Sequence, residues 1–151
     1  MGYLFQLPGP DALGKPPTID LKARNDFHIN LAGRNLFESG QKSWGASHAF
    51  SHGALNKGQW VEFMMDVVWA ADSSGGITVH RRDQGLIRWT QVFQARNTPT
   101  LQYKTGKAVG THYWKAGYYR NTPLNFKSQL QLGPIARGVS VDQMTAWSNH
   151  Y

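Results

Sequence analysis

The chain contains no cysteine, so neither disulfide bridges nor thiolate metal sites can form among its 151 residues. No stretch reaches the roughly 18 consecutive apolar residues of a membrane-spanning helix. Long apolar patterns of helical period are also missing, whereas glycine is frequent, with 16 residues. The missing helical periods and the frequent glycine together favour an all-β domain.

Acidic residues are scarce. The chain has 9 Asp and Glu against 16 Lys and Arg, a formal net charge of +7. Such an excess indicates nucleic acid, anionic lipid or acidic polysaccharide as partners, although it also fits a charge that only keeps the protein soluble. Arg81-Arg82 is the one adjacent basic pair, and no run of five like charges marks a nucleic-acid tail. Nucleic-acid binding therefore rests on charge and aromatics alone. A polyanion built of sugar rings fits the spread charge and the 13% aromatic content better.

Apolar and polar residues alternate in several segments bounded by Gly, Pro, Asn or Asp, which is typical of antiparallel strands. We expect strands near residues 3–7, 18–24, 27–31, 59–72, 77–82, 86–95, 101–104 and 113–120, and a last one with Leu130, Leu132 and Ile135. Two hairpins are predicted, over residues 18–31 and 59–82, the second with Ile77 and Val79 inward. Ser140-Val141-Asp142-Gln143 fits a capping box and predicts one short helical turn. Together these elements predict a single domain over residues 1–151.

Residues 33–58 are polar and rich in Gly and Ser, and we expect a long loop that covers a groove as a lid. His48 and His52 have the spacing of a helical metal pair, but the surrounding glycines disfavour a helix and two histidines are too few ligands. Acidic residues form no recognisable calcium loop. The sequence therefore predicts no metal site at these residues; it gives no support for calcium but leaves calcium binding open.

The most informative stretch is Tyr113-Trp114-Lys115-Ala116-Gly117-Tyr118-Tyr119-Arg120. Alternation in a strand puts Tyr113, Lys115 and Tyr119 on one face and Arg120 on the other. An ammonium can pair with a sugar carboxylate, and a phenol can move a proton. The same run also fits an ordinary amphipathic strand with a solvated lysine.

The run Tyr-x-Lys-Ala-Gly-x-Tyr resembles the signature strand of the jelly-roll polysaccharide lyases, the alginate, glucuronan and heparin lyase-like group. The resemblance implies an all-β, two-sheet antiparallel jelly-roll sandwich of concanavalin A-like type. It implies that Tyr119 is the catalytic tyrosine and that Lys115 and Tyr113 line the groove. Gln6 matches the Gln of a second signature strand, but Pro8 stands where the family has His.

The resemblance and the charge pattern together predict a site for an acidic, uronate-containing polysaccharide, cleaved by β-elimination without a cofactor. The predicted catalytic residues are Tyr119, Gln6 and Lys115. The predicted substrate-binding residues are Tyr113, Lys22, Arg24, His28, Arg120 and Asn121. His28 also fits a solvent-facing strand histidine, and we expect His80, Arg81 and Arg82 to be solvated. Because Pro8 replaces the family His, a non-catalytic module that binds acidic glycans, or a structural module, is the alternative.

The family's first signature strand, rich in Arg and Glu, has no counterpart, so the resemblance covers the later part of a lyase domain. We therefore expect the N-terminal strand to lie at a sheet edge covered by a loop, another chain or a missing part of a longer protein. The resemblance implies an extracellular or periplasmic location, although no signal-peptide pattern is visible.

Overall fold

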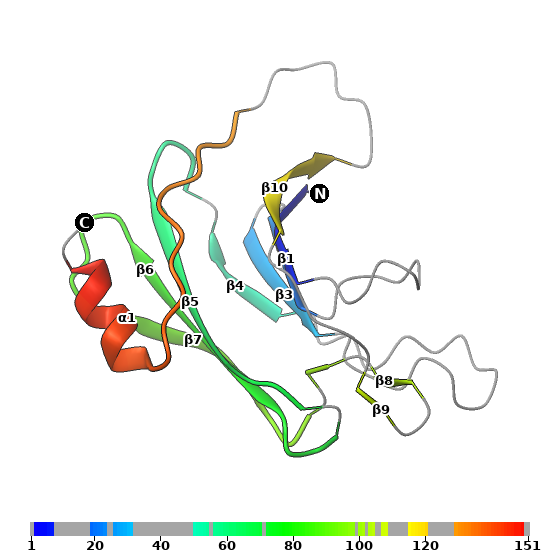
Figure 1. Ribbon diagram of the computed structural model, residues 1–151. Helices are drawn as coiled ribbons and strands as arrows, with labels where there is room; N and C mark the ends of the chain where they lie inside the picture. Colours follow the sequence, from blue (N-terminus) through cyan, green and yellow to red (C-terminus); the bar gives the residue numbers. More distant parts are fainter. Residues whose placement is uncertain are drawn as a thin grey trace.

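The protein is mostly β in its computed structural model (Figure 1). The structure describes residues 56–70, 72–98, 100–101 and 129–149 in full, and elsewhere the backbone of individual strands. The elements, in chain order, are β1 (Gly2–Leu7), β2 (Ile19–Ala23), β3 (Asp26–Leu31), β4 (Phe50–Ala54), β5 (Val61–Val68), β6 (Gly76–Asp83), β7 (Thr90–Arg96), β8 (Tyr103–Lys104), β9 (Lys107–Ala108), β10 (Lys115–Arg120) and α1 (Val141–Ser148).

Strands β5, β6 and β7 form an antiparallel three-stranded sheet with β6 in the centre. The alternating residues of β6 bury one face, and Ile77 and Val79 are 2% and 0% exposed, which confirms their predicted inward position. Phe93 of β7 is the register partner of Val79 and is buried too. The turn between β5 and β6 is stabilised locally. Asp72 Oδ1 accepts hydrogen bonds from the Ser74 hydroxyl and amide, and these bonds lower the pKa of Asp72.

Strands β10, β1, β2, β3 and β4 form a second antiparallel sheet, in that order. The predicted hairpin over residues 18–31 is confirmed by the regular pairing of β2 with β3. The prediction of a continuous loop over residues 33–58 is wrong, because β4 lies inside it and pairs with β3. Its Ser, His and Gly residues weaken the strand signal, so the pairing with β3 decides its conformation.

The N-terminal strand does not lie at a sheet edge, contrary to prediction. β1 lies between β10 and β2, so both of its sides are hydrogen-bonded, and in the described part of the chain the outer strands of this sheet are β10 and β4. The prediction failed because β10, distant in sequence, occupies the place beside β1. The backbone groups of β1 therefore need no cover from a further chain.

The two larger sheets and the helix are arranged in succession in Figure 1, with the five-stranded sheet on one side of the three-stranded sheet and α1 on the other. β4 approaches β7, and α1 approaches β5. Met64 of β5 is 8% exposed and shares its face with Glu62. Glu62 accepts a hydrogen bond from Arg82, which also donates to the Ser148 carbonyl of α1. The helix α1 thus covers part of the face that carries Glu62 and Met64.

The segment before α1 is not the last strand that Leu130, Leu132 and Ile135 predicted. Residues 129–138 have no strand pairing, and Leu132 and Ile135 are 53% and 55% exposed. Pro134 lacks the N–H that a ladder needs, and Gly133 lies against the Trp60 ring.

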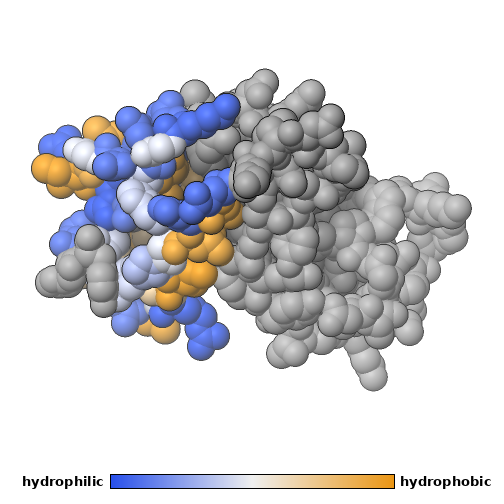
Figure 2. Space-filling view, turned by 90° about the horizontal axis from the view of Figure 1, so that it is seen from above, coloured by the Kyte–Doolittle hydropathy of each residue, from blue (hydrophilic) through white to orange (hydrophobic). Residues whose placement is uncertain are grey.

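On the surface seen in Figure 2, hydrophobic residues gather in patches among hydrophilic ones.

The predicted helix start is confirmed, although the helix runs for eight residues rather than one turn. Ser140 is the N-cap, and its hydroxyl accepts a hydrogen bond from the Gln143 amide at 3.2 Å. The Gln143 side chain accepts in return from the Val139 amide at 2.9 Å. The first bond satisfies an amide that the first turn leaves without a helical partner, and the second fixes the residue before the cap.

A buried threonine holds the chain after β7 against the end of β5. Thr100 is fully buried, and its hydroxyl donates to the Val68 carbonyl at 2.7 Å and accepts from the Ala70 amide at 2.9 Å. Gly75 lets this segment approach closely, because a Cβ there would lie 2.4 Å from the Thr98 carbonyl oxygen. The contact holds this segment against the turn end of the β5–β6 hairpin.

Candidate active site

The signature stretch forms β10, and its register with β1 brings together residues that are far apart in the sequence. Gln6 is the Cα partner of Lys115, and Tyr3 is the partner of Tyr119. Directly opposite residues of an antiparallel pair share a face of the sheet, with Cβ atoms about 4.5–5.5 Å apart. The predicted catalytic amide and ammonium thus occupy opposed positions.

A β-bulge in β1 settles which residues share that face. The pairing of β1 with both β10 and β2 shifts between Tyr3 and Phe5. Tyr3 and Gln6 are an odd number of residues apart, yet their partners Lys22 and Asp20 are an even number apart in β2, whose pairing with β3 is regular. Even spacing in a regular strand keeps residues on one face. The register therefore assigns Tyr3 and Gln6 to one face, and their partners Tyr119 and Lys115 share it.

The same face continues across β2 and β3. Lys22 is the partner of Tyr3, and His28 is the partner of Lys22. Two of the predicted substrate-binding residues therefore lie in the row that begins with Tyr119. The neighbouring row joins Gln6 to Asp20 and, beyond it, to Asn30.

The opposite face carries an apolar row. Its members follow one another from β10 to β4 and are Ala116, Phe5, Leu21, Ile29 and Phe50. Arg120 pairs with Gly2 and Gly2 with Ala23, so the register assigns Arg120 to this second face, away from Tyr119. Tyr113, Arg24 and Asn121 lie outside the described residues.

Sequence reasoning did not select Tyr3, Asp20, Asn30 or Ser51, although the register puts all four on the face of Tyr119. Ser51 was missed because β4 was not predicted, and Asp20 and Asn30 belong to no motif that would distinguish them from other polar strand residues. Tyr3 carries no readable signal, since strict alternation from Gln6 assigns it to the other face. A bulge changes that assignment, and it depends on pairing between strands.

Arg81 and Arg82 are not solvated, and that prediction is wrong. They are 8% and 9% exposed. Arg81 Nε donates to Asp83 Oδ1 at 2.6 Å within the same strand, and the two side chains form a salt bridge. Strong pairing of this kind is what allows an arginine to be buried.

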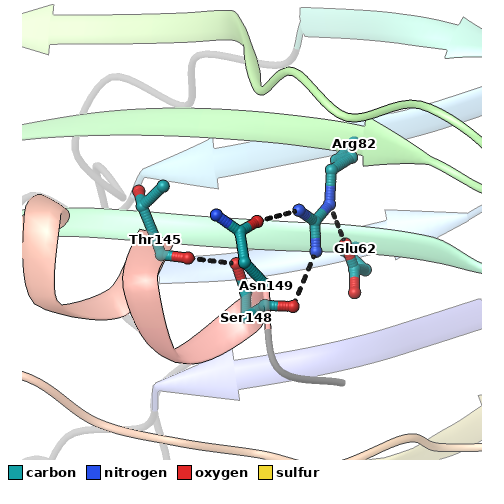
Figure 3. Close-up of polar contacts among 5 residues, drawn as sticks. All are labelled: Glu62, Arg82, Thr145, Ser148 and Asn149. Atoms are coloured by element: carbon teal, nitrogen blue, oxygen red, sulfur yellow. Dashed lines mark hydrogen bonds and ion pairs between the residues drawn. The ribbon is translucent and has the colours of Figure 1, made fainter.

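Arg82 holds the C-terminal helix against the three-stranded sheet (Figure 3). Its guanidinium donates to the Glu62 carboxylate across the strand pair, to Asn149 Oδ1 at 2.9 Å and to the Ser148 carbonyl at 3.1 Å. It also lies 4.7 Å from the centroid of the Trp89 ring. These contacts account for Arg82 as a structural residue, on elements other than those of the Tyr119 row.

The residues described in full contain no cluster of three or more His, Asp or Glu side chains that could hold a metal ion. No helix within the same ranges has the length and apolar content needed to cross a membrane.

A comparison with protein-family models gives a match. The family model described as polysaccharide lyase matches residues 14–145, which is most of the chain. Neither the curated proteins nor the solved structures contain a match. The matched span includes β10 and the Lys22–His28 pair, whereas β1 precedes it.

Proposed function

The chain belongs to the polysaccharide lyase family, and from this we propose that it cleaves an acidic, uronate-containing polysaccharide by β-elimination. Membership of the family implies lyase activity on a polysaccharide, and the choice of an acidic one follows from charge. The net charge of +7 favours a polyanion. Lys115 and Lys22, on the face assigned to Tyr119, would provide cations along its path.

We propose that the two larger sheets are the layers of a concanavalin A-like jelly-roll sandwich. The apolar row of the five-stranded sheet would pack on the face of the three-stranded sheet that buries Ile77, Val79 and Phe93. The opposite, polar face would then be free to bind substrate. Such a sandwich would support the proposal, because the apolar face of the five-stranded sheet would form the core and the polar face would bind the polysaccharide.

The observation that carries the proposal is the opposition of Gln6 and Lys115 on the face assigned to Tyr119. β-Elimination removes the weakly acidic proton at C5 of a uronate, and negative charge builds up on its carboxylate as that proton leaves. An amide and an ammonium that hydrogen-bond this carboxylate would stabilise the charge, as oxyanion donors do. Tyr119 would then donate its proton to the leaving glycosidic oxygen.

Tyr119→Phe tests the assignment. The substitution removes one hydroxyl and keeps the ring, so we expect the release of unsaturated uronate ends, followed by their ultraviolet absorbance, to fall by about 10²–10⁴-fold. Binding of the same polysaccharide should change little. Tyr118→Phe is the matched control, because it removes a hydroxyl from the adjacent position of β10. Equal turnover in the wild type and Tyr119→Phe would contradict the role of Tyr119.

A non-catalytic module that binds acidic glycans is the second candidate, and Pro8 in place of the family His favours it. The polar face would then bind the glycan without cleaving it. Incubation with a panel of polyuronates and glycosaminoglycans separates the two functions. Binding without unsaturated products favours the module, whereas their appearance favours the lyase. An extracellular or periplasmic location agrees with either function, since polysaccharides of this class are met outside the cytoplasm.

A further inference from the structure

The row that contains Tyr119 has a second tyrosine in it. Tyr3 of β1 is the partner of Tyr119 on one side and of Lys22 on the other. The row continues through His28 to Ser51, so it crosses all five strands. Two phenols and an ammonium thus occupy consecutive register positions in three neighbouring strands.

Tyr3 owes this position to the bulge in β1. In a regular β1, Tyr3 would share a face with Phe5 and Leu7, which belong to the apolar side. The register shift between Tyr3 and Phe5 transfers Tyr3 to the polar side while Phe5 stays opposite Leu21. Bulges often re-aim one residue beside an active site. Here the shift puts Tyr3 opposite the proposed catalytic tyrosine, Tyr119.

The missing family histidine creates a need for a second proton-transfer group. Gln6 is present, but Pro8 offers no base. β-Elimination needs a base for the C5 proton and an acid for the leaving oxygen. His28 of the same row is separated from Tyr119 by β1 and β2, whereas Tyr3 is the direct partner of Tyr119. We propose that Tyr3 is the general base and Tyr119 the general acid of the elimination, an assignment that rests on the proposed lyase function.

The proton and electron movements balance between the two phenols. The Tyr3 phenolate takes the proton from C5, and the electron pair of that C–H bond forms the C4=C5 double bond. The bond between C4 and the glycosidic oxygen breaks, and the oxygen takes the proton of the Tyr119 hydroxyl. A proton returned from Tyr3 to Tyr119, directly or through water, restores the starting state.

The register favours Tyr3 as the base. Lys22 is directly opposite Tyr3, whereas the direct partner of Tyr119 is Tyr3 itself. An adjacent ammonium favours the ionised form of a phenol, whose ordinary pKa is about 10. Tyr3 is therefore the phenol better placed to lose its proton.

Three variants test the proposal on a polyuronate that the wild type cleaves. Tyr3→Phe is expected to lower kcat by about 10²–10⁴-fold, with polysaccharide binding within threefold of the wild type. Tyr118→Phe is expected to keep the wild-type kcat. Lys22→Met removes the cation that favours the phenolate, so the pKa of Tyr3 should rise. The acidic limb of the pH profile of kcat/KM should then move to higher pH.

The results separate the two proposals. If neither the wild type nor Tyr118→Phe cleaves any polyuronate, the lyase function fails, and the base assignment fails with it. If both cleave and Tyr3→Phe retains kcat within threefold, only the role of Tyr3 is overturned. If Tyr3→Phe does not fold, as judged by circular dichroism, the pH profile of Lys22→Met decides, and an unmoved acidic limb overturns the proposal.

Discussion

Replacing Arg82 by Met should loosen the C-terminal helix from the three-stranded sheet. The guanidinium bonds Glu62, Asn149 and the Ser148 carbonyl together, so the variant removes every polar contact shown between this residue and the helix end. Met keeps an unbranched side chain of similar length and preserves part of the packing on Trp89. The substitution therefore tests hydrogen bonding and charge more than volume.

The expected loss of stability in Arg82→Met depends on how exposed each hydrogen-bond partner of Arg82 is. The Glu62 side chain is 45% exposed, so its carboxylate returns to water and the lost ion pair contributes only about 0.2–1 kcal/mol. Ser148 is 8% exposed, and loss of a donor to its buried carbonyl costs about 1–3 kcal/mol. We expect the free energy of unfolding to fall by about 2–3 kcal/mol in total. In a domain of this length the fall corresponds to a Tm lower by roughly 4–12 °C.

Urea titration followed by tryptophan fluorescence measures this change. Arg96→Met is the matched control, because Arg96 is an exposed arginine on β7 and its replacement should stay within about 0.5 kcal/mol of the wild type. Hydrogen exchange at the amides of α1 should rise in Arg82→Met before the β6 amides respond. If Arg82→Met and Arg96→Met unfold at the same urea concentration, Arg82 does not hold the helix and the reasoning fails.

Two further predictions concern stability at other sites. Thr100→Val keeps the volume of a fully buried side chain but removes its hydrogen bonds to Val68 and Ala70. We therefore expect the free energy of unfolding, measured by urea titration, to drop by about 2–3 kcal/mol. Thr100→Ser should recover most of this loss, and a Val variant as stable as the wild type would refute the role of the hydroxyl. Ser140→Ala removes the cap that accepts from the Gln143 amide and should cost about 1 kcal/mol, with faster exchange confined to the first turn of α1; protection equal to the wild type in that turn would count against the cap.

The local sequence pattern predicted secondary structure correctly where a segment has its own hydrophobic period or capping residues. Alternation identified β5 and β6 and the inward position of Ile77 and Val79, because one buried face of a strand imposes a period of two. The cap at Ser140 was readable because its partners are three residues apart. The strand expected at Leu130 failed since a Gly-Pro pair interrupts its hydrogen bonding, and solvent covers its apolar residues.

Charge was the weakest guide, because burial depends on neighbours from elsewhere in the chain. Arg81 and Arg82 look alike in the sequence and were both expected in solvent. Asp83 partners the first, and Glu62 with the end of α1 partners the second. An arginine two residues from a carboxylate or beside a distant helix reads the same as a solvated one. Only the folded chain distinguishes them.

The amino-acid sequence determined the β-rich class, the positions of several strands, the basic surplus and the family to which the chain belongs, since these depend on composition, period and short motifs. The tertiary structure decided that β1 lies between β10 and β2, and therefore that Gln6 is opposite Lys115. It also decided that Tyr3 joins the face of Tyr119. Strand order and register are set by pairing over long sequence separations, and a one-residue shift in register moves a residue from one face of a sheet to the other.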